Sequence, residues 1–294
     1  MRERKIAPYF YIAPALILVL VLLYYPIIMN FIYSFHSFKA YSTEMKFVGL
    51  KNFARLFTDK KFFIALGNNF IFLAFNLLFQ VGFALVLGIL VENVARNRYG
   101  KICRTVYYIP SLFSVTAIAI MWQFIFEPSV GLMNNLFRNL GWDALVSTKG
   151  LLGQEATAIF AVAAMPQWQF TGYFMMLIIV SIQKIPYDLF EAAKIDGASN
   201  FKQAVSITIP MIKEMLLVTI VMTLVATFKS FAEVYQLTMG GPGYSTLVVG
   251  MYEYQNAFKF DKMGYSSAIG VVIFIFTFVF SVLQLKLSHS GEEM

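Results

Sequence analysis

Charged residues, cysteine and histidine are all scarce in this 294-residue chain. Only 13% of its residues are charged, whereas soluble domains carry about 25%. The single cysteine, Cys103, excludes an intrachain disulfide and a metal site built from several cysteines. Since 59% of the residues are hydrophobic, a soluble globule could not bury its apolar surface, and we expect a lipid bilayer as the solvent.

The sequence motifs of common nucleotide-binding and hydrolytic sites are missing as well. Gly100-Lys101 is followed by Ile102, and Ala95 stands where a phosphate-binding loop needs its first glycine. HExxH, CxxC and GxSxG do not occur. The two histidines, His36 and His289, leave little for catalysis or metal binding. We therefore expect no catalytic residue, no metal and no cofactor in this chain, and no binding or hydrolysis of ATP by it.

Long uncharged runs are what the chain has instead. Five of them exceed the roughly 20 residues that cross about 30 Å of hydrocarbon. A sixth run, residues 215–228, reaches only about 21 Å as a helix and spans only if it extends towards Phe231 or back towards Pro210. We predict an all-α integral membrane protein with one transmembrane domain over residues 1–294. Its six helices are expected at about 9–33, 64–91, 105–126, 157–182, 211–232 and 264–286.

Charges at the ends of these runs give the expected orientation. Residues 1–5 resemble the start of a signal peptide, but the apolar run that follows is far too long, so we expect an uncleaved anchor. If the N-terminus lies inside the cell, the inside segments hold slightly more lysine and arginine than the outside segments. This small excess favours cytoplasmic termini, and the family resemblance given below implies the same orientation.

Residues 187–210 form a charged segment between two apolar runs. Pro186 suits the first turn of a helix, and apolar side chains then recur at helical spacing over residues 189–195. Gly197 stands where a helix would end in a left-handed residue, and a second short helix can run over residues 200–208. The segment predicts a helix, a tight turn and a helix outside the bilayer, suited to binding a partner protein. The plain alternative is an amphipathic connector.

This segment resembles the EAA loop of the membrane subunits of bacterial ABC importers. The resemblance rests on Glu191-Ala192-Ala193, on Asp196-Gly197-Ala198 and on Ile207-Thr208-Ile209-Pro210, in which Ile209 replaces the usual leucine. It implies that Glu191, Ala192, Ala193, Asp196, Gly197 and Ala198 couple the chain to a cytoplasmic ATPase subunit. It also implies a bacterial cell (plasma or inner) membrane as the location, and ATP and Mg²⁺ bound by the ATPase partners.

Further stretches are similar to the carbohydrate-importing permeases related to the maltose transporter. They are residues 104–110, Trp122, Gly131, Asn134, Trp168, Gly172 and the turn Gly240-Gly241-Pro242-Gly243. The resemblance implies half of a translocation pathway for a sugar or oligosaccharide. The implied partners are a second permease, two ATPase subunits and an extracytoplasmic solute-binding protein that contacts Gly240–Gly243. Alternatives are an importer for another small solute such as glycerol phosphate, an intramembrane hydrolase and a channel.

Polar residues within the expected spans are the candidates for the substrate pathway, because burying them costs free energy unless they are paired or used. The candidates are Asn76, Gln80, Gln167, Trp168, Gln169, Tyr173 and Lys229. A sugar needs hydrogen-bond partners for its hydroxyls and aromatic rings for its C–H faces, and residues 167–173 supply both within two turns. The alternative for these residues is interhelical hydrogen bonding and an aromatic belt. For Lys229 it is an ion pair with Glu233.

The connectors outside the bilayer carry weaker signals. Residues 47–53 predict the start of a short amphipathic helix lying outside. Residues 127–155 and 233–262 read as external loops, the second with a rigid turn at Gly240–Gly243.

Overall fold

The computed structural model describes residues 7–42, 44–94, 98–142 and 148–289. The chain divides into two compact units. The first unit holds residues 1–62 and 252–276, and the second holds residues 63–251 and 277–294. Helices α4 (Lys60–Phe75), α15 (Val249–Tyr254) and α16 (Met263–His289) have residues in both units.

The first unit begins with a helix that contains a π-helical turn. Its elements are α1 (Ala7–Val19), the π segment η1 (Leu20–Tyr24), α2 (Tyr25–Ser34), β1 (His36–Ser37), β2 (Lys46–Phe47) and α3 (Lys51–Leu56). The π segment ends two residues before Pro26, whose ring nitrogen cannot donate to the preceding turn. β1 and β2 pair antiparallel with His36 opposite Phe47. The predicted outer helix therefore begins at Lys51 and follows a strand, not at residue 47.

Partly buried polar contacts tie the connectors of the first unit to its helices. Asp59 Oδ2 accepts hydrogen bonds from the hydroxyls of Tyr252 (2.5 Å) and Tyr265 (2.7 Å). Burial alone would raise the pKa of Asp59, but the hydrogen bonds from the two tyrosines and from the backbone of Lys61 and Phe62 together outweigh it and hold this pKa below its ordinary value. The Arg55 guanidinium lies 4.5 Å from the centre of the Tyr265 ring. These contacts hold α3 and Asp59, which follows it, against α15 and the start of α16.

The second unit is almost entirely helical. Its elements up to the long central helix are α4 (Lys60–Phe75), η2 (Asn76–Val81, π), α5 (Gly82–Val94), α6 (Arg98–Tyr108), η3 (Ile109–Leu112, 3₁₀), α7 (Val115–Ile125), α8 (Leu132–Asn139) and α9 (Glu155–Ile182). After it come α10 (Tyr187–Ile195), α11 (Asn200–Gln203), η5 (Ala204–Thr208, π), α12 (Ile209–Met211), α13 (Lys213–Phe228), α14 (Ala232–Leu237) and parts of α15 and α16. The π segment η6 (Gln255–Lys259), between α15 and α16, belongs to the first unit.

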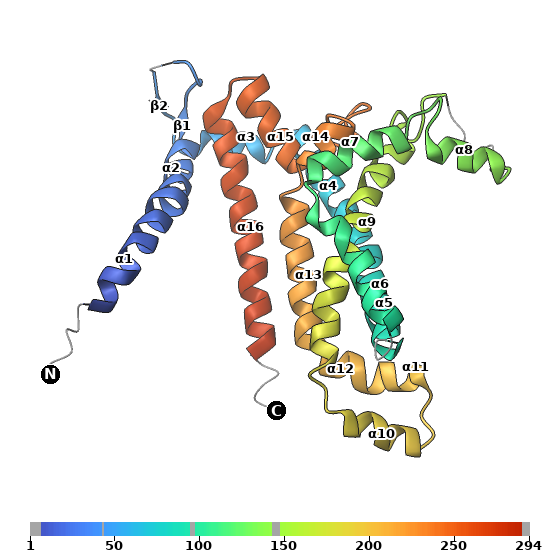
Figure 1. Cartoon of the computed structure of the whole chain (residues 1–294). Coiled ribbons are helices and arrows are strands. Elements are labelled where there is room, and N and C mark those ends of the chain that lie inside the picture. Colours follow the sequence, from blue (N-terminus) through green and yellow to red (C-terminus); the bar gives the residue numbers. More distant parts are fainter. Residues whose placement is uncertain (1–6, 43, 95–97, 143–147, 290–294) are drawn as a thin grey trace. The chain divides into compact units, whose positions relative to one another are not determined.

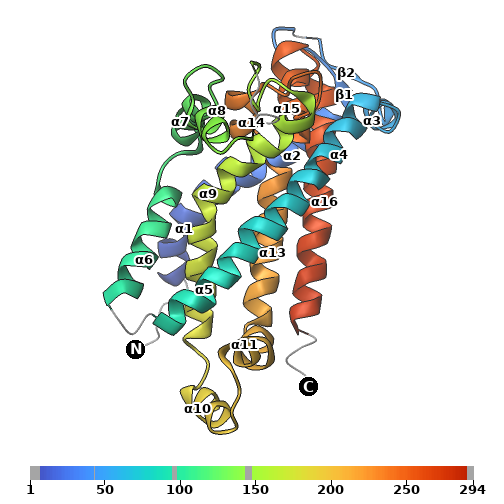
Figure 2. The ribbon, with the colours of Figure 1, turned by 90° about the vertical axis from the view of Figure 1, so that its right-hand side faces the viewer.

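Helix α9 is the centre of the second unit, and Figure 2 shows it between α6 and α13. Its apolar face packs against α5 in a core that includes Ala84, Phe174, Met175 and Ile178. Close approach of helices is achieved through glycine. A Cβ at Gly172 would lie 1.8 Å from the carbonyl oxygen of Tyr107 on α6. Small residues at such contacts are typical of helix pairs in membranes.

Three helices are long and apolar enough to cross a bilayer, judged by length and composition within the described residues: Tyr11–Ser34, Lys60–Glu92 and Met263–Gln284. Three further pairs of helices qualify only if each bent pair is counted as one span. They are Gly100–Leu112 with Val115–Ile125, Glu155–Ile182 with Tyr187–Ile195, and Asn200–Met211 with Lys213–Phe228, bent by 99°, 79° and 72°.

Two of the predicted spans are not single helices. The predicted span 105–126 is broken at Phe113, whose backbone is extended, and Ser114 then caps a new helix by accepting a hydrogen bond from the amide of Ala117 (3.2 Å). The predicted span 211–232 is helical only as α13, because the backbone leaves the helix at Ile212 and again after Phe228. The predicted external loops also contain helices α8, α14 and α15.

Candidate functional site

The segment at residues 187–208 forms a helical hairpin, which Figure 1 shows at the end of the second unit beyond α9 and α13. Pro186 is the residue immediately before α10, one position earlier than predicted. Gly197 has φ +77°, as the sequence predicted. The amide of Ala198 donates to the carbonyl of Ala193 (2.8 Å), and this bond closes the helix end. Ser199 then caps α11 by accepting from the amide of Lys202 (3.3 Å).

The helical hairpin exposes both charge and apolar surface. Glu191, Ala192 and Asp196 are exposed, and Ala193 and Ala198 are half-buried. Two large apolar side chains are also exposed, Ile195 at 87% and Phe201 at 80%. Large apolar side chains exposed on a charged surface are candidates for a protein interface. The hairpin therefore has the chemistry of a docking surface.

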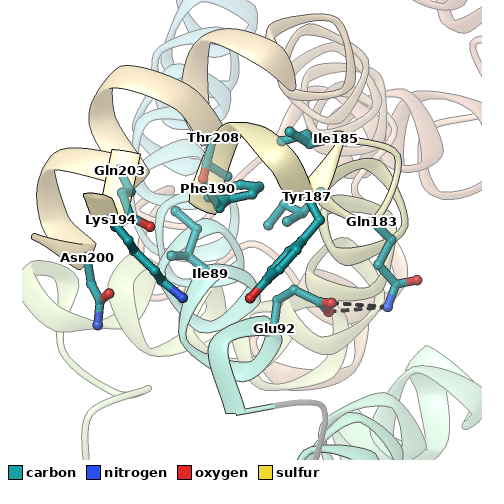
Figure 3. Close-up of a pocket in the computed structure, with 11 residues that line it drawn as sticks. Ile89, Glu92, Gln183, Ile185, Tyr187, Phe190, Lys194, Asn200, Gln203 and Thr208 are labelled. Carbon is teal, nitrogen blue, oxygen red and sulfur yellow. Dashed lines mark hydrogen bonds between the residues drawn. The ribbon is translucent and has the colours of Figure 1, made fainter. Parts of the chain in front are cut away.

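A hollow of about 350 Å³ lies behind this hairpin, against the ends of α5 and α9. Figure 3 shows the residues that line it: Ile89, Glu92, Ile182, Gln183, Ile185, Tyr187, Phe190, Lys194, Asn200, Gln203 and Thr208. Apolar side chains form part of the wall, and the charges of Glu92 and Lys194 stand at the rim. The hollow separates the outer surface of the hairpin from the ends of α5 and α9.

Polar contacts of Glu92 join three helices beneath the helical hairpin. Glu92 forms an ion pair with Arg104 on α6. It also accepts a hydrogen bond from Gln183 Nε2 (3.2 Å) at the end of α9, drawn as dashed lines in Figure 3. Glu92 was not predicted as a functional residue, because a lone acid in a basic connector carries no specific signal.

The candidate substrate-pathway residues Asn76 and Gln167 meet in the interior of the second unit. Gln167 Nε2 donates to Asn76 Oδ1 (2.6 Å), and Asn76 Nδ2 donates to Thr227 Oγ1 on α13 (2.9 Å). Asn69 continues this chain, since its Nδ2 donates to the carbonyl of Thr227 (2.8 Å) and its Oδ1 accepts from the amide of Val249 (2.7 Å). Thr227 was not predicted, because a threonine in an apolar helix usually bonds its own helix, as Thr227 also does.

The other candidates on α9 point elsewhere, because neighbouring helix residues project about 100° apart. Gln169 is buried and donates to the carbonyl of Phe113 (2.9 Å). Trp168 is 47% exposed, with its ring centre 6.5 Å from that of Trp122. Tyr173 packs against the edge of Phe174. Residues 167–173 therefore do not form one group of side chains around a single point.

The three remaining predictions have different outcomes. Gln80 is buried at the end of the π segment η2. Lys229 ends α13 with an exposed side chain, and within the described residues no ion pair joins it to the buried Glu233, so that predicted pair is wrong. Gly240–Gly243 forms the predicted tight turn, with φ of +90° at Gly240 and +62° at Gly243.

Loss of the Asn76 side chain is expected to loosen the second unit. Asn76→Ala leaves Gln167 and Thr227 without their shared partner, and interhelical hydrogen bonds of this kind contribute about 1 kcal/mol. We expect a lower midpoint of heat-induced unfolding in detergent. Asn139→Ala, at the exposed end of α8, is the matched control. Equal midpoints for the two variants would contradict a structural role for the Asn76 contacts.

Comparison with known proteins places this arrangement in a family. The model of the family described as "binding-protein-dependent transport system inner membrane component" matches residues 84–290. The probable ABC transporter permease protein YurN of Bacillus subtilis is 41% identical, over 100% of this chain and 99% of its own. The arabinooligosaccharides transport system permease protein AraP of Bacillus subtilis is 32% identical, over 98% of this chain and 90% of its own. The trehalose/maltose transport system permease protein MalF of Thermococcus litoralis is 31% identical, over 98% and 95%.

Solved structures share the fold. A chain in the crystal structure of a bacterial ABC transporter involved in the import of the acidic polysaccharide alginate has a TM-score of 0.84. It is 22% identical, and the match covers 98% of this chain and 96% of that one. At this identity the likeness concerns the fold alone.

Proposed function

Because this chain belongs to the family of binding-protein-dependent transport system inner membrane components, we propose that it is a permease subunit of an ATP-driven importer and forms half of the pathway for a sugar or oligosaccharide. The names of relatives support a carbohydrate as the transported solute. Besides AraP and MalF they include the lactose permease LacF of Rhizobium radiobacter, 31% identical over 93% of this chain. The alternative of glycerol phosphate has no support among these names.

The helical hairpin of residues 187–208 is the observation that carries the proposal. It presents Glu191, with Ile195 and Phe201, on its exposed surface, and its turn is fixed by the left-handed Gly197. A soluble ATPase that binds this surface can transmit its motion to the membrane helices through the chain that leads from α9 into the hairpin. That chain is bonded to Glu92. The chain itself is then no enzyme, and ATP and Mg²⁺ are bound by two ATPase subunits.

We propose the remaining parts of the importer from the family to which the chain belongs. The chain crosses the membrane six times, with each bent pair of helices counted as one span and both termini in the cytoplasm. A second permease completes the pathway, and the two rock so that a central cavity opens alternately to each side. An extracytoplasmic solute-binding protein delivers the sugar at the turn of Gly240–Gly243. Trp168, Tyr173 and Gln80 are candidates for lining the pathway.

Substitutions in the helical hairpin test this role. If Glu191 is buried against a basic group when the ATPase docks, Glu191→Ala strands a charge at a cost of about 3–5 kcal/mol, so the ATPase should no longer co-purify. A side chain at Gly197 costs about 1–2 kcal/mol in a left-handed backbone and changes the angle between α10 and α11. We expect Gly197→Asp to leave the complex assembled but to hydrolyse ATP without moving solute.

The measurements are co-purification of the ATPase, ATP hydrolysis and solute uptake, made in parallel on the assembled importer. Asp188→Ala, an exposed acid in the first turn of α10, is the matched control for Glu191→Ala. Normal assembly and transport by both Glu191→Ala and Gly197→Asp would reduce the hairpin to a connector and defeat the proposal.

A further inference from the structure

A cleft of about 340 Å³ lies at the elbow where α12 turns into α13, beside the end of α9. The chain bends there by 72°, because the backbone of Ile212 leaves the helical conformation. Part of the wall is apolar, formed by the buried Ile185 and by Met211 and Val218, both partly exposed. The cleft also takes in Ser181, Lys184, Glu214 and Met215. It is separate from the hollow behind the helical hairpin, although Ile185 contributes to both.

Two charged side chains of opposite sign, Lys184 and Glu214, line this cleft without meeting. Within the described residues neither forms an ion pair, for which nitrogen and oxygen would have to lie within 4.0 Å. Neither side chain makes a hydrogen bond to another described residue, and the hydroxyl of Ser181 makes none either. The cleft therefore offers a cation, an anion and a hydroxyl that are all available to a ligand. A ligand with a negative and a positive group would satisfy all three.

The place of the cleft indicates what the ligand is. It lies where two apolar helices, α9 and α13, end, and this is the level at which hydrocarbon gives way to lipid headgroups. Along α13 the exposed side chains that continue from the cleft are apolar, at Val218 and Met222. A molecule seated here can keep its polar end at the elbow and lay a hydrocarbon chain along the helix.

We propose that this cleft binds a phospholipid whose headgroup carries both a phosphate and a primary ammonium, as phosphatidylethanolamine does. Lys184 and Ser181 donate to the phosphate, and Glu214 accepts from the ammonium. A purely anionic lipid would satisfy Lys184 but would be repelled by Glu214. A choline headgroup carries the positive charge but has no N–H to donate to Glu214.

Native mass spectrometry of the full chain in detergent tests this assignment. The protein is titrated with phosphatidylethanolamine, phosphatidylglycerol and phosphatidylcholine of the same acyl chains. We expect tighter binding of phosphatidylethanolamine than of the other two. A contact between one lysine and a lipid surface corresponds to about a fivefold change in affinity, so Lys184→Ala should weaken binding by about that factor. Glu214→Gln should remove the preference for phosphatidylethanolamine over phosphatidylglycerol.

Lys213→Ala is the matched control, because Lys213 is an exposed neighbour that does not line the cleft. The double variant Lys184→Glu, Glu214→Lys keeps both charges in the cleft and should recover part of the affinity that each single reversal loses. Equal binding of phosphatidylethanolamine and phosphatidylglycerol by the unaltered chain would overturn the proposal. So would equal effects of Lys184→Ala and Lys213→Ala, or loss of the bound lipid when the importer is purified whole.

Discussion

Gly172→Ala is expected to prevent the second unit from packing. The new Cβ would lie 1.8 Å from the carbonyl oxygen and 2.3 Å from the carbonyl carbon of Tyr107. These are backbone atoms of α6, so no side chain can rotate away, and α6 and α9 must separate. Overpacking that shifts backbone costs about 1–3 kcal/mol and occasionally more, and we expect this substitution to lie at or above the upper end of that range.

The measurement for Gly172→Ala is the yield of monodisperse protein in detergent and the midpoint of its heat-induced unfolding. Gly67→Ala on α4 is the matched control, because no atom lies within 4 Å of a Cβ built there. Alanine is also favoured over glycine within helices by up to about 1 kcal/mol, so the control should be as stable as the unaltered protein or more so. An unfolding midpoint for Gly172→Ala equal to that of the control would contradict the close contact of α6 and α9.

Glu253→Gln is expected to stabilise the first unit at neutral and alkaline pH. Burial raises the pKa of Glu253 from 4.5 to about 7. The Glu253 side chain lies against Gly270 of α16. A Cβ built on Gly270 would lie 2.7 Å from Oε1 of Glu253 and 3.1 Å from Nδ2 of Asn30. Between pH 4.5 and 7 the folded chain binds this proton and the unfolded chain does not, so stability falls as pH rises through that window. The loss amounts to about 3 kcal/mol above pH 7.

Glutamine keeps the shape of the side chain and removes the ionisation. The midpoint of heat-induced unfolding should therefore be similar for Glu253→Gln and the unaltered chain near pH 4, and higher for the variant at pH 8. Glu191→Gln, at an exposed position on α10, is the matched control and should not change this dependence on pH. Parallel pH profiles for Glu253→Gln and the unaltered chain would show that Glu253 does not carry a raised pKa.

Local chemistry explains which parts of the fold the sequence predicted. The hairpin was predictable because Gly197 and Ser199 fix a helix end and a helix start within a few residues. Apolar runs predicted the long helices at Lys60–Glu92 and Met263–Gln284, because length and composition are enough to identify a membrane-spanning helix. The 99° bend after Leu112 was not predicted. The residues on both sides of it are apolar, and an uninterrupted apolar run does not show where a helix changes direction.

The contacts that build the interior could not be read from the sequence. Asn69 and Val249 lie 180 positions apart, and Asp59 and Tyr252 lie 193 apart. Each of these residues has many conceivable partners until the helices are placed. The polar residues of α9 show the converse, because residues close in sequence can have distant partners. Gln167 and Gln169 are close in sequence, but they bond to Asn76 and to Phe113 respectively.

The π-helical segments bear on how this chain can be aligned with its relatives. Among the described residues four of them interrupt or adjoin helices, at Leu20–Tyr24, Asn76–Val81, Ala204–Thr208 and Gln255–Lys259. A π turn holds one more residue than an α turn, and without it every later side chain would be rotated by about 100°. Deletion of one residue inside such a segment can therefore be absorbed by a return to α geometry. Single-residue gaps between homologous permeases can fall within these helices without changing which residues face the core.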